Sequence, residues 1–516
     1  MQQQLLLNDK DVCLKDLSDL QALDPDFFPA LLQSHAQTET QHFDLLFAAP
    51  QARLTLAATR EQPLLRFTDE VAWLNPADDF LSNLDRWFTD QTHSIQTHSI
   101  RNQSAVNVES DRQALNLPFE GGWFIYLSYE LVYQIEPSLA DCFTPLLSHN
   151  STLPIAEAVR IPLAVIYDRL TRQWFIVVDD SWLAAQPTAE VIRGLLDSPV
   201  TVQTLMAETR LNSEFRKLVR YLQQWINITG HNREVAPVAV ENFAEEAPER
   251  YLQGIETIQQ HIVDGDVFQI NLSRQWDLVL PPVEPATLYQ RLSQVNPAPF
   301  ASLMHWNQQA VVSSSPERLV EVRQGSVSTR PIAGTRPRGA IPEQDVRLKQ
   351  ELGVHPKEQA EHIMLIDLER NDLGRICQTG SVMVDELMAI ETYPHVHHIV
   401  SNVRGQLKPD CLPGEVIRAV FPGGTITGCP KVRCMEILVG LEQQARSAYT
   451  GSLGYLNLNG DMDLNILIRT MIVQQTQNQT QVSFRTGGGI VMDSQPDAEL
   501  AETKAKAQGL LNVFDR

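Results

Sequence analysis

The sequence has few cysteines and no long apolar run, which argues against a disulfide-rich secreted protein and against a membrane-spanning protein. Six cysteines are spread over 516 residues, and no CxxC or Cys/His spacing typical of a zinc site occurs. We therefore expect free thiols in a reducing cytoplasm rather than disulfides. No stretch approaches the roughly 20 apolar residues of a transmembrane helix, and the start, MQQQLLLNDKDV, lacks the cationic region of a signal peptide. We expect no membrane span and a cytoplasmic location.

Positive charge is also scarce. The chain has 41 Lys and Arg against 63 Asp and Glu, a net charge of −22 at pH 7. So acidic a surface repels the phosphates of nucleic acids and of anionic membranes, and we expect neither as a partner. A local group of arginine, lysine and metal can still hold a small anion. No GxGxxG or GxxxxGK[ST] motif occurs, which argues against nucleotide binding.

Polar stretches divide the chain. The proline-containing, acidic stretch 228–248 is typical of a linker, and it separates an N-terminal region, 1–227, from a second region, 249–516. The tandem QTHSIQTHSI contains His93 and His98, which we interpret as a duplicated surface loop rather than a metal site.

Hydrophobic patterning predicts a mixed fold. Apolar residues at helical spacing predict a helix over 251–262, and many short strand-like segments are joined by short turns, such as the polar run 474–480. We therefore expect an α/β (α+β) sandwich with largely antiparallel sheets flanked by helices. The predicted strands are 42–49, 52–58, 160–168, 174–180, 267–272, 310–314, 319–322, 449–458 and 482–485.

Two pairs of glutamates carry the first chemical signal. Glu358 and Glu361 lie in the helical stretch 357–372, and Glu499 and Glu502 lie in AELAETKAKAQGLL. Residues three apart share a helix face. Two such helices facing each other form the oxygen-rich site that Mg²⁺ prefers, with positions left for water and substrate. For either pair alone, an exposed acidic helix face is the plain alternative.

Glycine-rich segments carry the second signal. FPGGTITGCPK (421–431) and TGGGI (486–490) are predicted to be turns, and PIAGTRPRG (331–339) is predicted to be a loop that either holds a carboxylate or crosses the surface. Glycine lets backbone N–H groups approach an anionic ligand closely, although tight turns between strands have the same composition.

These segments belong to a longer ordered series of motifs. The series is SSPERL (314–319), RPIAGTRPRG (330–339), EHIMLIDLERNDLGR (361–375), HVHHIVS (395–401), FPGGTITGCPKVRCMEIL (421–438), YTGSLGY (449–455), MDLNILIRT (462–470) and TGGGIVMDSQPDAELAET (486–503). It resembles the signature of the chorismate-utilising enzymes over about 250–510. Within that family the chain is most similar to aminodeoxychorismate synthase component I and next to anthranilate synthase component I, which implies the anthranilate synthase component I-like fold.

The resemblance implies roles for individual residues. Glu361 and Glu502 match the family's magnesium ligands, with Glu358 and Glu499 behind them through water. Glu317 matches a general acid beside the departing ring hydroxyl, His398 a histidine beside the ring, and Thr335 a third catalytic position. The matching substrate-binding positions are Gly334, Thr335, Tyr449, Arg469, Gly487, Gly488, Gly489 and Lys506.

The residue two positions before Thr335 points to the nucleophile. At this position the family's isochorismate and salicylate synthases, which use water, have a lysine, and so do many aminodeoxychorismate synthases. By this resemblance, Ala333 of the present chain replaces that lysine. Alanine neither activates water nor forms an adduct, so we expect ammonia to be the nucleophile. No GxCxG nucleophile motif surrounds any cysteine. The ammonia is therefore expected from a separate class I glutamine amidotransferase subunit.

Two products remain open at this point. Ala333 is the usual anthranilate synthase residue, whereas the FPGGTITG and TGGGIV segments look more like aminodeoxychorismate synthase, of para-aminobenzoate and folate biosynthesis. We favour the second, and a non-catalytic chorismate-binding homologue is a further alternative. Ser34, Pro299 and Phe300 match parts of a tryptophan pocket, while Gln33 replaces the glutamate typical of tryptophan-inhibited enzymes.

Overall fold

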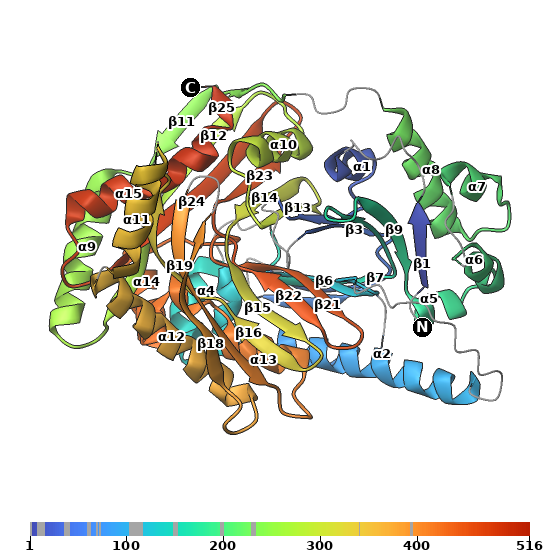
Figure 1. The fold of residues 1–516 in the computed structure, drawn as a ribbon, viewed down its shortest axis with the longest axis horizontal. Helices are drawn as coiled ribbons and strands as arrows, with labels where there is room; N and C mark the ends of the chain where they lie inside the picture. The colour runs from blue at the N-terminus through green and yellow to red at the C-terminus, as the bar shows by residue number, and fades with distance from the viewer. Residues whose placement is uncertain are drawn as a thin grey trace.

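Two large sheets lie face to face, and each is covered by helices on its outer side (Figure 1). The computed structural model describes residues 3–7, 16–35, 42–58, 63–68, 71, 74–102, 117–147, 153–196, 201–228, 234–339, 341–354, 356–392 and 396–515. Every strand pairing within the two large sheets that the structure describes is antiparallel. The predicted fold class, a mixed sandwich of antiparallel sheets with flanking helices, is confirmed.

The first sheet has 12 strands. In order they are β1 (Gln3–Leu7), β9 (Gln173–Val178), β8 (Leu163–Asp168), β3 (Phe43–Ala48), β2 (Ala30–Gln33), β13 (Phe300–Trp306), β14 (Gln309–Ser315), β23 (Thr470–Gln475), β24 (Thr480–Ile490), β12 (Gln269–Leu280) and β11 (Asn242–Glu245), with β20 (Gly428–Cys429) beside β12. Its outer face packs on α1 (Leu17–Leu23), α5 (Asp180–Ala184), α6 (Ala189–Leu196), α7 (Val202–Ala207), α8 (Ser213–Asn227) and α10 (Pro285–Val295).

The second sheet has 11 strands. In order they are β17 (Ile332–Pro337), β19 (Val396–Gln406), β16 (Ser326–Thr329), β15 (Arg318–Arg323), β22 (Met462–Asn465), β21 (Ser452–Asn457), β6 (Gly122–Leu127), β7 (Ala156–Ile161), β4 (Arg53–Ala57) and β5 (Leu64–Phe67), with β18 (Met383–Thr392) also beside β19. Its outer face packs on α2 (Phe80–Asn102), α12 (Pro356–Ile376) and α13 (Pro413–Val420).

The remaining helices lie around these layers. They are α3 (Val132–Ile135), α4 (Ala140–Leu147), α9 (Pro248–Val263), α11 (Pro342–Val354), α14 (Lys431–Glu442) and α15 (Pro496–Leu511). The helix predicted over 251–262 is therefore confirmed as part of α9. No helix within the described ranges is both long and apolar enough to cross a membrane.

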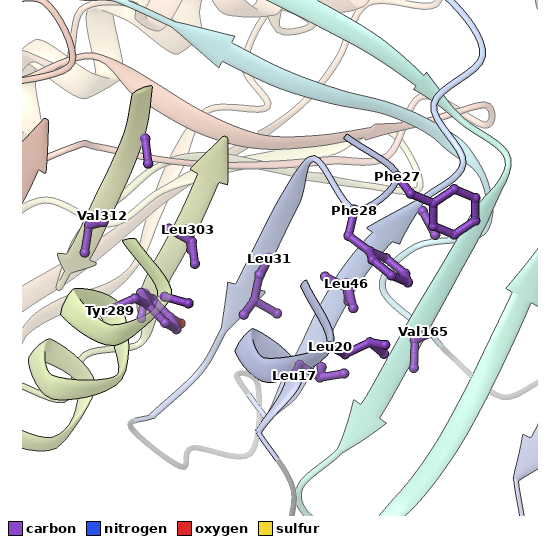
Figure 2. Close-up of a cluster of buried hydrophobic side chains, with 14 of the residues drawn as sticks. Leu17, Leu20, Phe27, Phe28, Leu31, Leu46, Val165, Tyr289, Leu303 and Val312 are labelled. Carbon is purple, nitrogen blue, oxygen red and sulfur yellow. The ribbon is translucent and has the colours of Figure 1, made fainter. Parts of the chain in front are cut away.

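A shared core joins the two sequence regions. Figure 2 shows Leu17 and Leu31 of the first region in one cluster with Tyr289 and Leu303 of the second. Both sheets contain strands from 1–227 and from 249–516. Side chains on successive strand residues point to opposite faces, and both faces are covered, so a strand such as β6, GWFIYL, is buried along its whole length. Burial on both faces explains why the central strands are continuously apolar.

Three local predictions need correction. Pro162 divides the strand predicted over 160–168, because it lacks the N–H that a continuous ladder needs, and β7 and β8 enter different sheets. The QTHSI repeat continues α2 as a helix, since it contains no glycine or proline to stop it, and the side chain of His98 lies outside the described residues. The stretch interpreted as a linker contains β10 (Val238–Ala239), paired with β25 (Phe514–Asp515), and the edge strand β11.

Candidate active site

The glycine run at the end of β24 lies within a strand and not in a turn, so that prediction is wrong. Gly487, Gly488 and Gly489 pair with consecutive residues of β12, and Gly488 faces Leu272. A Cβ atom added at Gly487 would lie 2.4 Å from the backbone oxygen of Leu272. A glycine here therefore serves the close approach of two strand backbones rather than a change of chain direction.

Three oxygen atoms surround the open side of Gly488. A Cβ atom at this position would lie 3.3 Å from Glu499 Oε2, 3.7 Å from Glu502 Oε1 and 3.8 Å from the hydroxyl of Tyr251. The two glutamates come from successive turns of α15, and Tyr251 comes from α9; both helices pack together beside β24 (Figure 1). Lys506, one turn further along α15, pairs with Glu502 at 2.6 Å and donates to the Gly487 carbonyl at 2.9 Å. We call the space above Gly488 the glycine cradle.

The other predicted glutamate pair lies beside a different glycine. Gly334 has a φ of +68°, and a Cβ atom there would lie 2.8 Å from Glu358 Oε2. Both the left-handed backbone and this close approach require glycine. Glu358 forms a 3.1 Å ion pair with Arg336, and Glu361 follows one turn later on α12. The side chain of Thr335 lies outside the described residues, but its backbone pairs with that of His398.

The carboxylates suit Mg²⁺ by chemical type. Glu499 and Glu502 present oxygen atoms to the same space as the Tyr251 hydroxyl, which is buried and has no hydrogen-bond partner among the residues that the structure describes. Such a cradle of oxygen atoms fits a hard cation. In the residues that the structure covers, no three His, Cys, Asp or Glu side chains converge as a ligand group, and Glu358 and Glu502 each pair with a basic side chain. The magnesium site therefore stays a prediction.

Glu317 is placed to act as a proton donor. It follows β14 at the centre of the first sheet and is 7% exposed. Burial raises the pKa of its carboxyl group to about 7, against the opposing effects of the Thr425 hydrogen bond and of the positive charges of Arg469 and Lys506. The Thr425 hydroxyl donates to Glu317 Oε1 at 2.6 Å. A substantial fraction of Glu317 is therefore protonated at neutral pH.

Arg469 lies within electrostatic range of both Glu317 and His398. Within the described ranges, the half-buried Arg469 guanidinium forms neither a hydrogen bond nor an ion pair, although Tyr449, Glu502 and Glu317 lie within its electrostatic influence. An arginine held in this way is available to a carboxylate ligand. Burial lowers the pKa of His398 to about 4, so its ring is neutral at pH 7.

The predicted tryptophan-pocket residues line a second cavity. Ser34, Pro299 and Phe300 border a space of about 650 Å³ that no predicted catalytic residue lines. Gln33 also lines it, and its side-chain amide donates to Asp44 at 3.0 Å and accepts from the hydroxyl of Tyr289. The backbone of Phe300 pairs with Ser315, two residues before Glu317, so the cavity and the candidate site share one strand pair.

Sequence reasoning missed two residues of the site. Thr425 belongs to the FPGGTITG segment, which was interpreted only through its glycines, although a hydroxyl within a glycine-rich segment is itself a signal. Tyr251 fits the apolar pattern of its helix, and nothing in that pattern distinguishes a tyrosine hydroxyl that faces a carboxylate pair. Only the packing of α9 against α15 brings that hydroxyl to the glycine cradle.

Comparisons with known proteins agree with this geometry. A family model described as chorismate binding enzyme matches residues 36–512. An anthranilate synthase component I-like protein of Synechocystis sp. (strain ATCC 27184 / PCC 6803 / Kazusa) is 39% identical over 405 residues, which are 78% of this chain and 74% of that protein. Aminodeoxychorismate synthase component 1 of Bacillus subtilis (strain 168) is 45% identical over 304 residues, 58% of this chain and 63% of that protein. The solved structure of anthranilate synthase component I from Streptococcus pneumoniae TIGR4 is similar with a TM-score of 0.68 and 25% identity, over 92% of this chain and 93% of that one.

Proposed function

The chain belongs to the family of chorismate-binding enzymes, and from this premise we propose that it is a synthase subunit that aminates chorismate with ammonia. The proposed product is 4-amino-4-deoxychorismate, formed together with water. The proposed ammonia source is a separate glutamine amidotransferase subunit, because no cysteine of the chain stands in a GxCxG motif.

The nature of residue 333 carries the proposal. Ala333 lies in β17, where its backbone pairs with Ile399 and directly precedes Gly334. A methyl group cannot take a proton from water and cannot attack the substrate ring. A chorismate enzyme with alanine here therefore needs a nucleophile that requires no activation, and the unprotonated NH3 molecule, unlike water, attacks through its free electron pair without a base.

Glu317 and Arg469 support this chemistry. Arg469 is the proposed partner of a chorismate carboxylate, which accepts two parallel hydrogen bonds from a guanidinium. Glu317 would give its proton to the ring hydroxyl as the carbon–oxygen bond breaks, so that water leaves. The nitrogen of ammonia forms the new bond to the ring and then loses one proton, which returns Glu317 to its acid form directly or through solvent.

Magnesium is part of the proposal. Glu361 and Glu502 would hold the ion, with Glu358 and Glu499 acting through water. The bound ion would supply positive charge for the ring carboxylate of chorismate. The remaining roles of positioning and proton transfer then fall to the side chains of the chain itself.

The identity of the product has support on both sides. The 45% identity to an aminodeoxychorismate synthase component 1 and the FPGGTITG and TGGGIV segments favour 4-amino-4-deoxychorismate. Ala333 and the similarity to anthranilate synthase component I from Streptococcus pneumoniae favour anthranilate, which is the second candidate.

The test is to incubate the purified chain with chorismate, Mg²⁺ and ammonium and to identify the products by mass spectrometry. We expect an aminated product that keeps the enolpyruvyl group. Anthranilate with an equal amount of pyruvate would replace the first candidate by the second. Isochorismate would overturn the reasoning from Ala333. No consumption of chorismate, even with a glutaminase partner and glutamine, would support a non-catalytic binding protein.

A further inference from the structure

We propose that Tyr251 is a positioning residue of the metal site, and that its hydroxyl group donates to the Glu499 carboxylate when a cation occupies the glycine cradle. The inference rests on the proposed function, because it concerns the carboxylates that we assign to magnesium. Tyr251 itself matches none of the site positions that the sequence motifs contain.

Tyr251 carries a polar atom into an apolar cluster. Its ring is 2% exposed and packs among apolar side chains of α9, β12, α14 and β24, which include Ile255, Ile258 and Leu272. A phenylalanine ring would make the same apolar contacts. The hydroxyl is buried and has no hydrogen-bond partner among the described residues. A buried hydroxyl without a hydrogen-bond partner destabilises a folded protein. We therefore expect the Tyr251 hydroxyl to interact with a polar neighbour.

The glycine cradle supplies that neighbour. The Tyr251 hydroxyl and Glu499 Oε2 lie 3.8 and 3.3 Å from the same point, the Cβ position above Gly488. The other oxygen of this carboxylate, Oε1, accepts from the hydroxyl of Ser494 at 2.7 Å. Ser494 therefore fixes one end of the carboxylate, and the end that faces the cradle is the one that shares its space with Tyr251.

The negative charges of the two glutamates at the glycine cradle suggest a role for the Tyr251 hydroxyl. Glu499 and Glu502 are both on the open side of Gly488, and their negative charges repel each other. Lys506 pairs with Glu502 at 2.6 Å. On cation binding, a hydrogen bond from this neutral donor to Glu499 would hold the carboxylate in place without adding charge that opposes the cation. Residues that support metal ligands in this way typically contribute about 10- to 100-fold in metal affinity.

The test compares Tyr251→Phe with wild type in Mg²⁺ affinity, measured by isothermal titration calorimetry with Mg²⁺ alone, and in thermal unfolding without metal. The matched control is Tyr126→Phe, since the Tyr126 hydroxyl is also buried but its ring lies in the core between the sheets. We expect Tyr251→Phe to weaken Mg²⁺ binding about tenfold, with a metal-free Tm equal to or above that of wild type. Tyr126→Phe should leave Mg²⁺ affinity unchanged.

Other outcomes separate the possible failures. Equal Mg²⁺ affinity of Tyr251→Phe and wild type would overturn the role of Tyr251 and leave the magnesium assignment standing. A lower metal-free Tm with unchanged affinity would show a purely structural hydroxyl and would overturn it as well. If wild type itself binds no Mg²⁺, the metal assignment in the proposed function fails first, and this inference fails with it.

Discussion

Gly488→Ala is the substitution that most sharply separates the function of the glycine cradle from the stability of the fold. The added methyl group would lie 3.3 Å from Glu499 Oε2 and 3.7 Å from Glu502 Oε1, so it would occupy the space between the carboxylates without touching the backbone of another strand. The residue is not among those with left-handed backbone, so alanine is conformationally acceptable. We expect the free energy of unfolding to change by less than about 1 kcal/mol. Because displaced reacting groups cost about 100-fold in rate, kcat/KM for chorismate amination should fall about 100-fold.

The neighbouring glycine provides the control for this prediction. A Cβ atom at Gly487 would lie 2.4 Å from the Leu272 carbonyl oxygen, and a strand backbone cannot move aside as a side chain can. Gly487→Ala should therefore destabilise the protein by about 1–3 kcal/mol. Urea unfolding gives the stabilities, and the initial rate of chorismate loss gives kcat/KM. Wild-type activity of a folded Gly488→Ala would refute the assignment of the cradle to the active site.

Three further predictions concern the proposed chemistry. Glu361→Gln and Glu502→Gln should each abolish Mg²⁺-dependent turnover with near-native circular dichroism spectra, and unchanged turnover in both would remove the metal assignment. Since Glu317 donates a proton only while it is protonated, kcat/KM for chorismate, measured at a constant concentration of unprotonated NH3, should fall as the pH rises through about 7, and Glu317→Gln should lose about 10²- to 10⁴-fold in kcat; a flat profile from pH 6 to 8 would contradict its role as acid. Ala333→Lys should introduce isochorismate formation or a covalent adduct visible by mass spectrometry, and an unaltered product pattern would weaken the argument from residue 333.

The periodicity of apolar residues predicted helices and turns correctly where the local sequence pattern matches the environment of the segment in the fold. The helical spacing that begins at Tyr251 predicted α9, and the polar run 474–480 predicted the turn between β23 and β24. The antiparallel character followed from the short connections.

The pairing of strands that are far apart in the sequence could not be predicted from local sequence patterns. The glycines of β24 were interpreted as a turn because glycine is typical of turns, whereas the requirement for Gly487 comes from Leu272, more than 200 positions earlier in the chain. The stretch 228–248 looked like a linker partly because it contains β11, an edge strand whose side chains are exposed to solvent.

In the candidate site, too, local spacing was predictable from the sequence and long-range packing was not. Glu499 and Glu502 were recognisable from their spacing, since a helix places residues three apart on one face. Their meeting with Gly488 and Tyr251 depends on how α9 and α15 pack on β24, and no spacing within either helix encodes that. The raised pKa of Glu317 likewise comes from burial by segments that are distant in the sequence.

The most direct test of the central claim is to follow the nitrogen itself. Purified chain, chorismate and Mg²⁺ are incubated with ¹⁵N-labelled ammonium, and the product is examined by nitrogen and carbon NMR. We expect ¹⁵N bonded to ring carbon 4, an intact enolpyruvyl group and no free pyruvate. Label at carbon 2 with release of pyruvate would contradict the favoured product, and unlabelled product from water addition would contradict chorismate amination altogether.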